Sequence, residues 1–230
     1  MVLEKIKTGI SGLDEMLNGG IPIHRHVAIF GGPGTGKTTL GFEFLYRGAK
    51  EGTPGLYLTL EESPDDIIAN MTNQFSNLMD IEDLIKQEKL FVEAPSDYTI
   101  DTIVKVLETH IIEKNVARAV IDSATMVKAM FNSESEYRRT IVEFFNLLKN
   151  LECNTFLLVE ADTSERTKIK FGIEHYILDG IINLYSLDKV DHRVRVLEIF
   201  KMRGTDHSRN LVPFKVTPDG VKVYVGEKVF

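Results

Sequence analysis

The sequence predicts an α/β fold with a largely parallel central sheet, helices on its flanks and an antiparallel C-terminal extension. Short apolar runs are the first reason, because they are rich in β-forming residues and nearly continuous, as in strands buried on both faces. These runs occupy residues 27–30, 56–60, 90–92, 119–121 and 156–159. Helical periodicity between the runs is the second reason, and a change of pattern after Asp179 is the third.

Two of the intervening segments show helical periodicity clearly. Their apolar residues recur three or four positions apart, which places them on one face of a helix. One face consists of Ile100, Ile103, Leu107 and Ile111, and the other, on a helix after Ser135, consists of Ile141, Phe144, Phe145, Leu148 and Leu151. Strands and helices therefore alternate, as they do in a doubly wound α/β core.

The C-terminal third has a different pattern. The pattern predicts strands at 180–185, 194–201, 212–216 and 221–225. Turn signals separate these segments, and none of the connections contains a helix long enough for a crossover. Residues 187–193 read as a polar hairpin tip, and Pro-Asp-Gly at 218–220 as a tight turn. This third should extend the sheet with antiparallel strands. Because no linker-like tract or repeat interrupts the chain, we expect a single domain over residues 1–230.

The composition is that of a soluble globular protein. Of the 230 residues, 43% are hydrophobic and 27% are charged, which favours a sizeable core over extensive disorder. No apolar run approaches the ~18 residues of a membrane span, so we expect a cytoplasmic protein without membrane association. The single cysteine, Cys153, excludes an intrachain disulfide and should be a small core residue. The net charge of −7 argues against a surface that binds nucleic acid everywhere.

One motif carries the strongest chemical signal. The pattern Gly31-x4-Gly36-Lys37-Thr38 lies between an apolar run that ends at Phe30 and a helix that opens near Lys37, which is the context of a phosphate-binding Walker A loop. Glycines let backbone N–H groups surround a phosphate, and the helix N-terminus faces the same anion. Lys37 should reach the β and γ oxygens of ATP, and the Thr38 hydroxyl should ligate Mg²⁺. The predicted phosphate-binding residues are Gly32, Pro33, Gly34, Thr35, Gly36, Lys37, Thr38 and Thr39.

Acidic residues at the ends of three apolar runs could complete this site. Asp122 ends the segment 117–122 in the form of a Walker B motif, so we expect it to help hold Mg²⁺. Hydrolysis also needs a base, and a serine rather than a second acid follows Asp122. Glu61 and Glu62, at the end of another run, are the candidates, although they could instead be solvated loop charges. Glu160 could sense the γ-phosphate through water or simply end its strand.

Two basic groups lie outside the motif. Arg166, Lys168 and Lys170 form a loop that could touch nucleic acid or an acidic partner, or could simply be solvated. Lys201 and Arg203 close a strand-like segment, and alternation puts their side chains on the same side. If this pair lies far from its own Walker A loop, it could act on the ATP of a neighbouring subunit as an arginine finger.

Taken together, the motifs resemble the KaiC-like branch of the RecA-type ATPases, which is related to archaeal RadA paralogues. The resemblance begins with Thr-Gly-Ile-Ser-Gly-Leu-Asp at 8–14 and Asn-Gly-Gly-Ile-Pro at 18–22, and it continues through the Walker A loop and Leu-Glu-Glu-Ser-Pro at 60–64. It then includes Val-Ile-Asp-Ser at 120–123, Phe-Gly-Ile-Glu-His at 171–175, Asp-Gly-Ile-Ile at 179–182 and Lys-Met-Arg-Gly-Thr-Asp-His at 201–207. These motifs cover nearly the whole chain.

The resemblance implies a RecA-like P-loop fold, ATP at subunit interfaces and a homo-oligomeric ring, usually a hexamer. It also implies that Glu61 is the water-activating glutamate, with Glu62 beside it. The residues implied to contact ATP across the interface lie in the motif at 201–207, namely Lys201, Met202, Arg203, Thr205 and His207.

The sequence departs from this family in two places. The circadian clock protein has two such domains and autophosphorylates an adjacent Ser-Thr pair in the second, whereas this chain reads Glu-His-Tyr-Ile-Leu at 174–178. That difference argues against autokinase activity. In addition, His24 and His26 occur after Pro22, where the family often has glycine. A metal site there would need a third ligand, and none is in view.

Three functions are compatible with these features. The leading one is a slow ATPase whose nucleotide state sets ring assembly or conformation. The second is a recombination or repair accessory protein that binds single-stranded DNA through residues 166–170. The third is a regulatory scaffold that binds ATP, barely hydrolyses it and docks a protein partner. A phosphotransferase is less favoured, since the sequence offers no dedicated acceptor pocket or lid.

Overall fold

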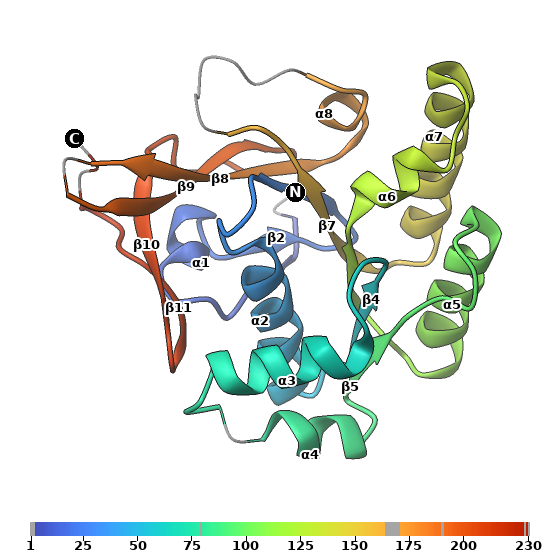
Figure 1. The fold of residues 1–230 in the computed structure, drawn as a ribbon, viewed down its shortest axis with the longest axis horizontal. Coiled ribbons are helices and arrows are strands. Elements are labelled where there is room, and N and C mark those ends of the chain that lie inside the picture. The colour runs from blue at the N-terminus through green and yellow to red at the C-terminus, as the bar shows by residue number, and fades with distance from the viewer. Residues whose placement is uncertain (1–2, 79, 164–170, 190, 228, 230) are drawn as a thin grey trace.

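A computed structural model describes residues 3–78, 80–163, 171–189, 191–227 and 229. Within them, a nine-stranded sheet has the order β11-β10-β9-β8-β3-β7-β6-β4-β5 (Figure 1). Its parallel strands are β3 (His26–Gly31), β4 (Gly55–Thr59), β5 (Leu90–Glu93), β6 (Arg118–Asp122), β7 (Asn154–Glu160) and β8 (Gly180–Asp188). The antiparallel extension consists of β9 (Arg193–Met202), β10 (Val212–Thr217) and β11 (Gly220–Val223), and a separate small sheet pairs β1 (Lys5–Ile6) with β2 (Ile21–Pro22).

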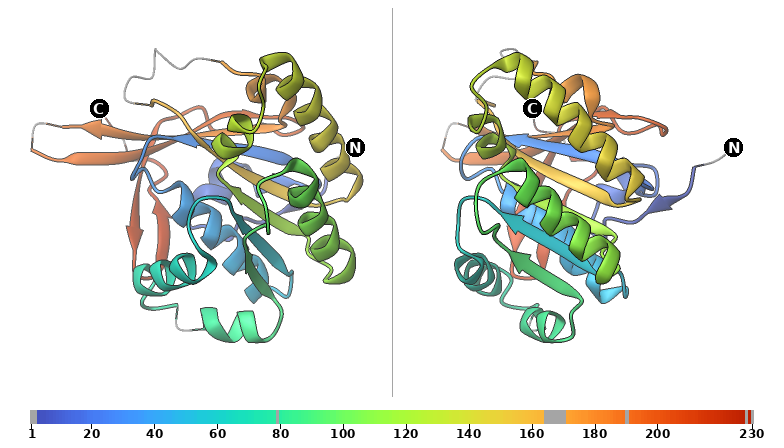
Figure 2. Two further views of the ribbon diagram at one scale, coloured as in Figure 1. Left: turned by 45° about the vertical axis from the view of Figure 1, so that its right-hand side comes forward. Right: turned by 90° about the vertical axis from the view of Figure 1, so that its right-hand side faces the viewer.

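Helices cover both faces of the sheet (Figure 2). They are α1 (Leu13–Met16), α2 (Lys37–Lys50), α3 (Pro64–Gln74), α4 (Ile81–Lys86), α5 (Ile100–Glu113), α6 (Ala124–Ala129), α7 (Glu134–Asn150) and α8 (Glu174–Ile177). Hydroxyl oxygens of Ser63, Thr99 and Ser133 accept backbone N–H groups at the starts of α3, α5 and α7, which fixes where these helices begin. One apolar cluster joins the sheet to α2, α3 and α4, and a second joins it to α5, α6 and α7.

The predicted fold class is confirmed, with shifts at the ends of several elements. β8 continues to Asp188 and β9 begins at Arg193, so the hairpin tip is shorter than the predicted 187–193. β11 ends at Val223 rather than at residue 225. Cross-strand pairing explains the longer hairpin, because Leu187 pairs with Val194 and Asp188 with Arg193 despite their polar surroundings. Cys153 is fully buried, as predicted, and none of the helices in the described ranges is long and apolar enough to cross a bilayer.

His26 begins β3 and lies inside the core. Only 3% of the residue is exposed, its ring packs against Phe145 at a centroid distance of 5.8 Å, and neither ring nitrogen has a hydrogen-bond partner within the described part of the chain. Burial lowers the pKa of His26 to about 4. His24 instead lies in a turn with φ of 54°, where its backbone N–H donates to Asn154 Oδ1. Among the described residues, no group of three His, Cys, Asp or Glu side chains is arranged to hold a metal ion.

We expect this buried imidazole to make the protein sensitive to acid. The unfolded chain protonates His26 near its ordinary pKa of 6.5, whereas the folded chain does so only near 4, so the unfolded state binds more protons between these values. The free energy of unfolding should therefore fall by roughly 3 kcal/mol from His26 alone as the pH drops through this window. Urea unfolding at several pH values, compared between the parent chain and His26→Phe, isolates this contribution. Identical pH dependence in both chains would contradict the assignment.

Candidate nucleotide site

The Walker A loop, residues 32–36, connects the end of β3 to the start of α2. Gly34 and Gly36 have positive φ values of 71° and 99°, which other residues rarely adopt. A Cβ added to Gly34 would meet no atom within 4 Å from the described residues other than its two chain neighbours. Thr35 Oγ1 donates to Gly32 O at 2.8 Å and closes the loop on itself. The loop thus leaves an open backbone surface at a helix N-terminus, which is the geometry that a phosphate group requires.

Lys37 lies across this loop. Its Nζ donates to Gly31 O at 2.9 Å and to Gly32 O at 3.2 Å, so the ammonium is held by backbone carbonyls. Burial lowers the pKa of Lys37, while the negative charges of Glu160, Asp122 and Glu61 oppose that shift. These three carboxylates follow or end the parallel strands β7, β6 and β4, whose carboxyl ends meet beside the loop.

Asp122 and Thr38 are in direct contact. The Thr38 hydroxyl donates to Asp122 Oδ2 at 3.0 Å, and the Tyr57 hydroxyl donates to the same oxygen. Asp122 is buried, and this burial raises the pKa of its carboxyl group. The two oxygen ligands predicted for Mg²⁺ are therefore adjacent, and their hydroxyl and carboxylate chemistry suits that ion.

Tyr57 is a site residue that the sequence prediction missed. It lies within the apolar run of β4, where the pattern predicts a core position for an aromatic residue. Its ring is fully buried. The available signal is the phenolic hydroxyl, because a buried tyrosine normally needs a polar partner. That partner is Asp122, 65 residues away in the sequence.

The two adjacent glutamates after β4 have different surroundings. Glu61 accepts a hydrogen bond from Ser123 Oγ, the residue directly after Asp122. Glu62 instead accepts one from Asn70 Nδ2 of α3 at 3.1 Å. Of the two, Glu61 is therefore the glutamate that contacts the residue next to Asp122. Glu160 is exposed at the end of β7, and its backbone N–H donates to Thr125 Oγ1 at 3.0 Å.

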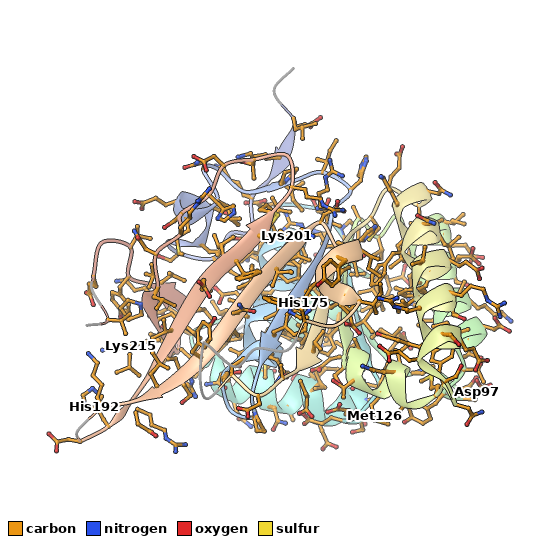
Figure 3. All side chains as sticks on the ribbon, turned by 90° about the horizontal axis from the view of Figure 1, so that it is seen from above. Asp97, Met126, His175, His192, Lys201 and Lys215 are labelled. Atoms are coloured by element: carbon orange, nitrogen blue, oxygen red, sulfur yellow. The ribbon has the colours of Figure 1, made fainter. Side chains whose placement is uncertain are left out.

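Two cavities border the Walker A loop. One, of about 650 Å³, includes Gly32, Thr35, Thr125 and Glu160 in its wall. The other, of about 670 Å³, lies beyond Pro33 and Gly34 and is lined by residues of β9, β10 and the β8–β9 turn. Figure 3 labels His192 of this turn and Lys215 of β10. Arg195 Nε donates to Gly34 O at 3.2 Å between the loop and this strand pair. Together these cavities offer room on both sides of the loop for phosphates and a nucleoside.

Lys201 and Arg203 lie away from the Walker A loop. Met202, between the two cations, pairs with Gly180, and Gly180 pairs with Val27. Lys201 and Arg203 are therefore level with the start of β3, whereas the Walker A loop follows the end of β3 at Gly31. Four residues of strand separate these levels by ~13 Å. Lys201 lies beside α8, which carries His175 (Figure 3).

The side chains of this pair point to one side, as the alternation predicted. Lys201 Nζ donates to His175 O at 2.9 Å and to Leu178 O at 2.7 Å, and Arg203 Nη2 donates to Tyr176 O at 2.8 Å. The intervening Met202 side chain points the other way and is 5% exposed in the core. Only its backbone is therefore available to a ligand.

Other predicted residues are distributed around this pair. Thr205 Oγ1 accepts from Lys5 Nζ at 2.7 Å, and the His207 ring contacts Ser208 O at 3.0 Å. Neither touches the Walker A loop of its own chain in a described contact. The candidate nucleic-acid loop with Arg166, Lys168 and Lys170 lies outside the described residues.

Comparisons with known proteins agree with this geometry. The family model described as "ATPase: KaiC" matches residues 6–228. A UPF0273 protein of Methanopyrus kandleri is 35% identical over 100% of this chain and 95% of its own length, and a UPF0273 protein of Thermotoga maritima is 33% identical over 98% of each.

Longer relatives and a solved structure extend the comparison. The circadian clock oscillator protein KaiC of Picosynechococcus is 33% identical over 96% of this chain, which spans only 45% of that relative. The crystal structure of a KaiC-like protein from Pyrococcus horikoshii has a TM-score of 0.86 at 33% identity, and the match covers 96% of this chain and 99% of the other. The chain therefore belongs to the KaiC family of ATPases.

Proposed function

We propose that this chain is a slow ATPase that binds Mg²⁺-ATP at the Walker A loop and completes each site with residues of a neighbouring copy. The hydrogen bond between Thr38 and Asp122 is the observation that carries the proposal. It brings a hydroxyl and a carboxylate together at the N-terminus of the helix that follows the loop. Mg²⁺ held there would supply positive charge that offsets the negative charge of the phosphates.

Residues of one chain would perform the binding and the activation of water. The backbone N–H groups of residues 34–38 would hold the phosphates, with Lys37 turning from its carbonyl partners toward the β and γ oxygens. Thr38 and Asp122 would hold the metal ion. Glu61 would accept a proton from the attacking water, since its carboxylate lies next to Ser123 and influences Lys37.

Residues of the next copy would stabilise the charge that develops on the γ-phosphate. Lys201 and Arg203 support this role because they lie at the opposite end of the sheet from their own loop and project to one side. Such an arrangement suits a heterologous interface, which repeats head to tail and closes into a ring. We propose a hexamer, with Thr205 and His207 on the same edge.

The mass of the particle tests this arrangement. With ATP and Mg²⁺ present, we expect light scattering to give about six times the chain mass of 26.0 kDa, and phosphate release to rise with assembly. A particle that remains monomeric at high protein concentration would contradict the shared site. Assembly without phosphate release would favour the regulatory scaffold, and release that requires single-stranded DNA would favour the recombination accessory protein.

A further inference from the structure

Asp179 lies between two arginines beside the Lys201–Arg203 pair. Its Oδ1 is 3.3 Å from Arg25 Nη1 and 3.9 Å from Arg203 Nη1, and the residue is 8% exposed. The backbone of Asp179 is fixed on both sides, because its N–H donates to His26 O at 3.0 Å and its carbonyl accepts from Arg203 N at 2.9 Å. The backbone that carries this carboxylate is therefore held by β3 and by the residue that follows β9.

This carboxylate neutralises part of a cationic cluster formed by Arg25, Lys201 and Arg203. In the described ion pairs, Arg25 and Arg203 each pair with Asp179 and with no other acid. Burial lowers the pKa of Lys201, and the charge of Arg203 lowers it further, while Asp179 raises it. Without the carboxylate, the two guanidinium groups would repel each other across a half-buried gap, and Arg203, with a side chain that is 51% exposed, is the one free to swing out.

The contacts of Arg203 show what the carboxylate contributes. Arg203 donates to two backbone carbonyls of α8, Tyr176 O at 2.8 Å and Ile177 O at 3.5 Å. Its contact with Asp179 is an ion pair without hydrogen-bond geometry. Asp179 thus fixes the position of the charge without occupying its hydrogen-bond donors. An anion that approaches from outside could recruit those donors while the guanidinium remains over Asp179.

We propose that Asp179 is a positioning residue that holds Arg203 where it meets the γ-phosphate of the neighbouring copy. This inference rests on the proposed shared site. Because a misplacement of about 1 Å can cost about 100-fold in rate, Asp179→Asn should lower kcat by roughly 10- to 100-fold. The KM for ATP should change less than about threefold, since the Walker A loop of the same chain is untouched.

Mixed assemblies separate positioning from a purely structural role. Lys37→Ala subunits lose their own nucleotide site yet present an intact Arg203, so they can complete the site of an Asp179→Asn subunit. In an equal mixture, roughly one interface in four joins the two intact halves, and turnover should recover to about a quarter of the parent rate. A mixture of Arg203→Ala with Lys37→Ala subunits calibrates the assay. The matched control is Glu88→Gln, which removes an exposed ion pair with Lys114 and should leave turnover unchanged.

Each outcome bears on one of the two claims. If Arg203→Ala with Lys37→Ala recovers no activity, the shared site is wrong. If that mixture recovers but Asp179→Asn with Lys37→Ala does not, or if Asp179→Asn alone turns over at the parent rate, the positioning role is wrong.

Should Asp179→Asn fail to fold, Asp179→Glu keeps the charge and moves it outward by one methylene. That variant should assemble with reduced kcat and recover in the same mixture, and parent-like kcat would overturn the proposal.

Discussion

Glu61→Gln is expected to lower the turnover of ATP by about 10²- to 10³-fold while leaving nucleotide affinity nearly unchanged. The amide keeps the size of the side chain and can still contact Ser123 Oγ, but it cannot accept a proton from water. ATP binding depends instead on the Walker A loop, Thr38 and Asp122, which this substitution does not touch. Single-turnover phosphate release together with equilibrium binding of a fluorescent ATP analogue measures both quantities.

The neighbouring glutamate provides the sharpest comparison. Glu62→Gln removes a charge at the adjacent position but affects a carboxylate that faces Asn70, so its loss of turnover should be at most a few-fold. Glu143→Gln, on the exposed face of α7, should match the parent chain. A larger loss from Glu62→Gln than from Glu61→Gln would reverse the assignment of the base.

The fold was largely predictable because its central strands are buried on both faces. The runs at β3, β4, β6 and β7 carry a continuous apolar signal, and the Walker A spacing locates the turn after β3. The hairpin end of β8 and β9 was less predictable, because Asp188 and Arg193 stabilise it by pairing with each other rather than by burial. A polar, exposed hairpin end lacks the apolar signal on which such predictions depend.

Contacts between distant segments account for what the sequence could not provide. Nothing local reveals that Tyr57 donates to Asp122, that Glu61 and Glu62 diverge, or that α8 supplies the carbonyls that hold Lys201 and Arg203. The alternation of residues along β9 did predict that this cation pair shares one side. Its distance from the Walker A loop follows only from the register of β3, β8 and β9.

Arg203→Ala is expected to lower turnover in the assembled particle by about 10³-fold, with a much smaller effect on ATP affinity. A guanidinium that meets the γ-phosphate from a neighbouring copy stabilises charge mainly in the transition state, so kcat should fall far more than KM rises. Arg203→Lys should recover only part of this loss, because an ammonium cannot offer paired donors to two phosphate oxygens. Steady-state kinetics with light scattering on the same samples would establish rate and assembly together, and Arg139→Ala on the exposed face of α7 is the matched control.

The dependence of this effect on protein concentration is its most specific signature. Arg203 lies at the level of the start of β3 and is held there by α8 and Asp179, so it cannot serve the loop that follows Gly31 in its own chain. Below the concentration at which copies assemble, the parent chain and Arg203→Ala should therefore turn over equally slowly. They should diverge only as assembly proceeds, since only then does the parent gain its second set of charges. A loss that is already complete in the monomer would show that Arg203 acts within its own chain and would remove the need for a neighbour.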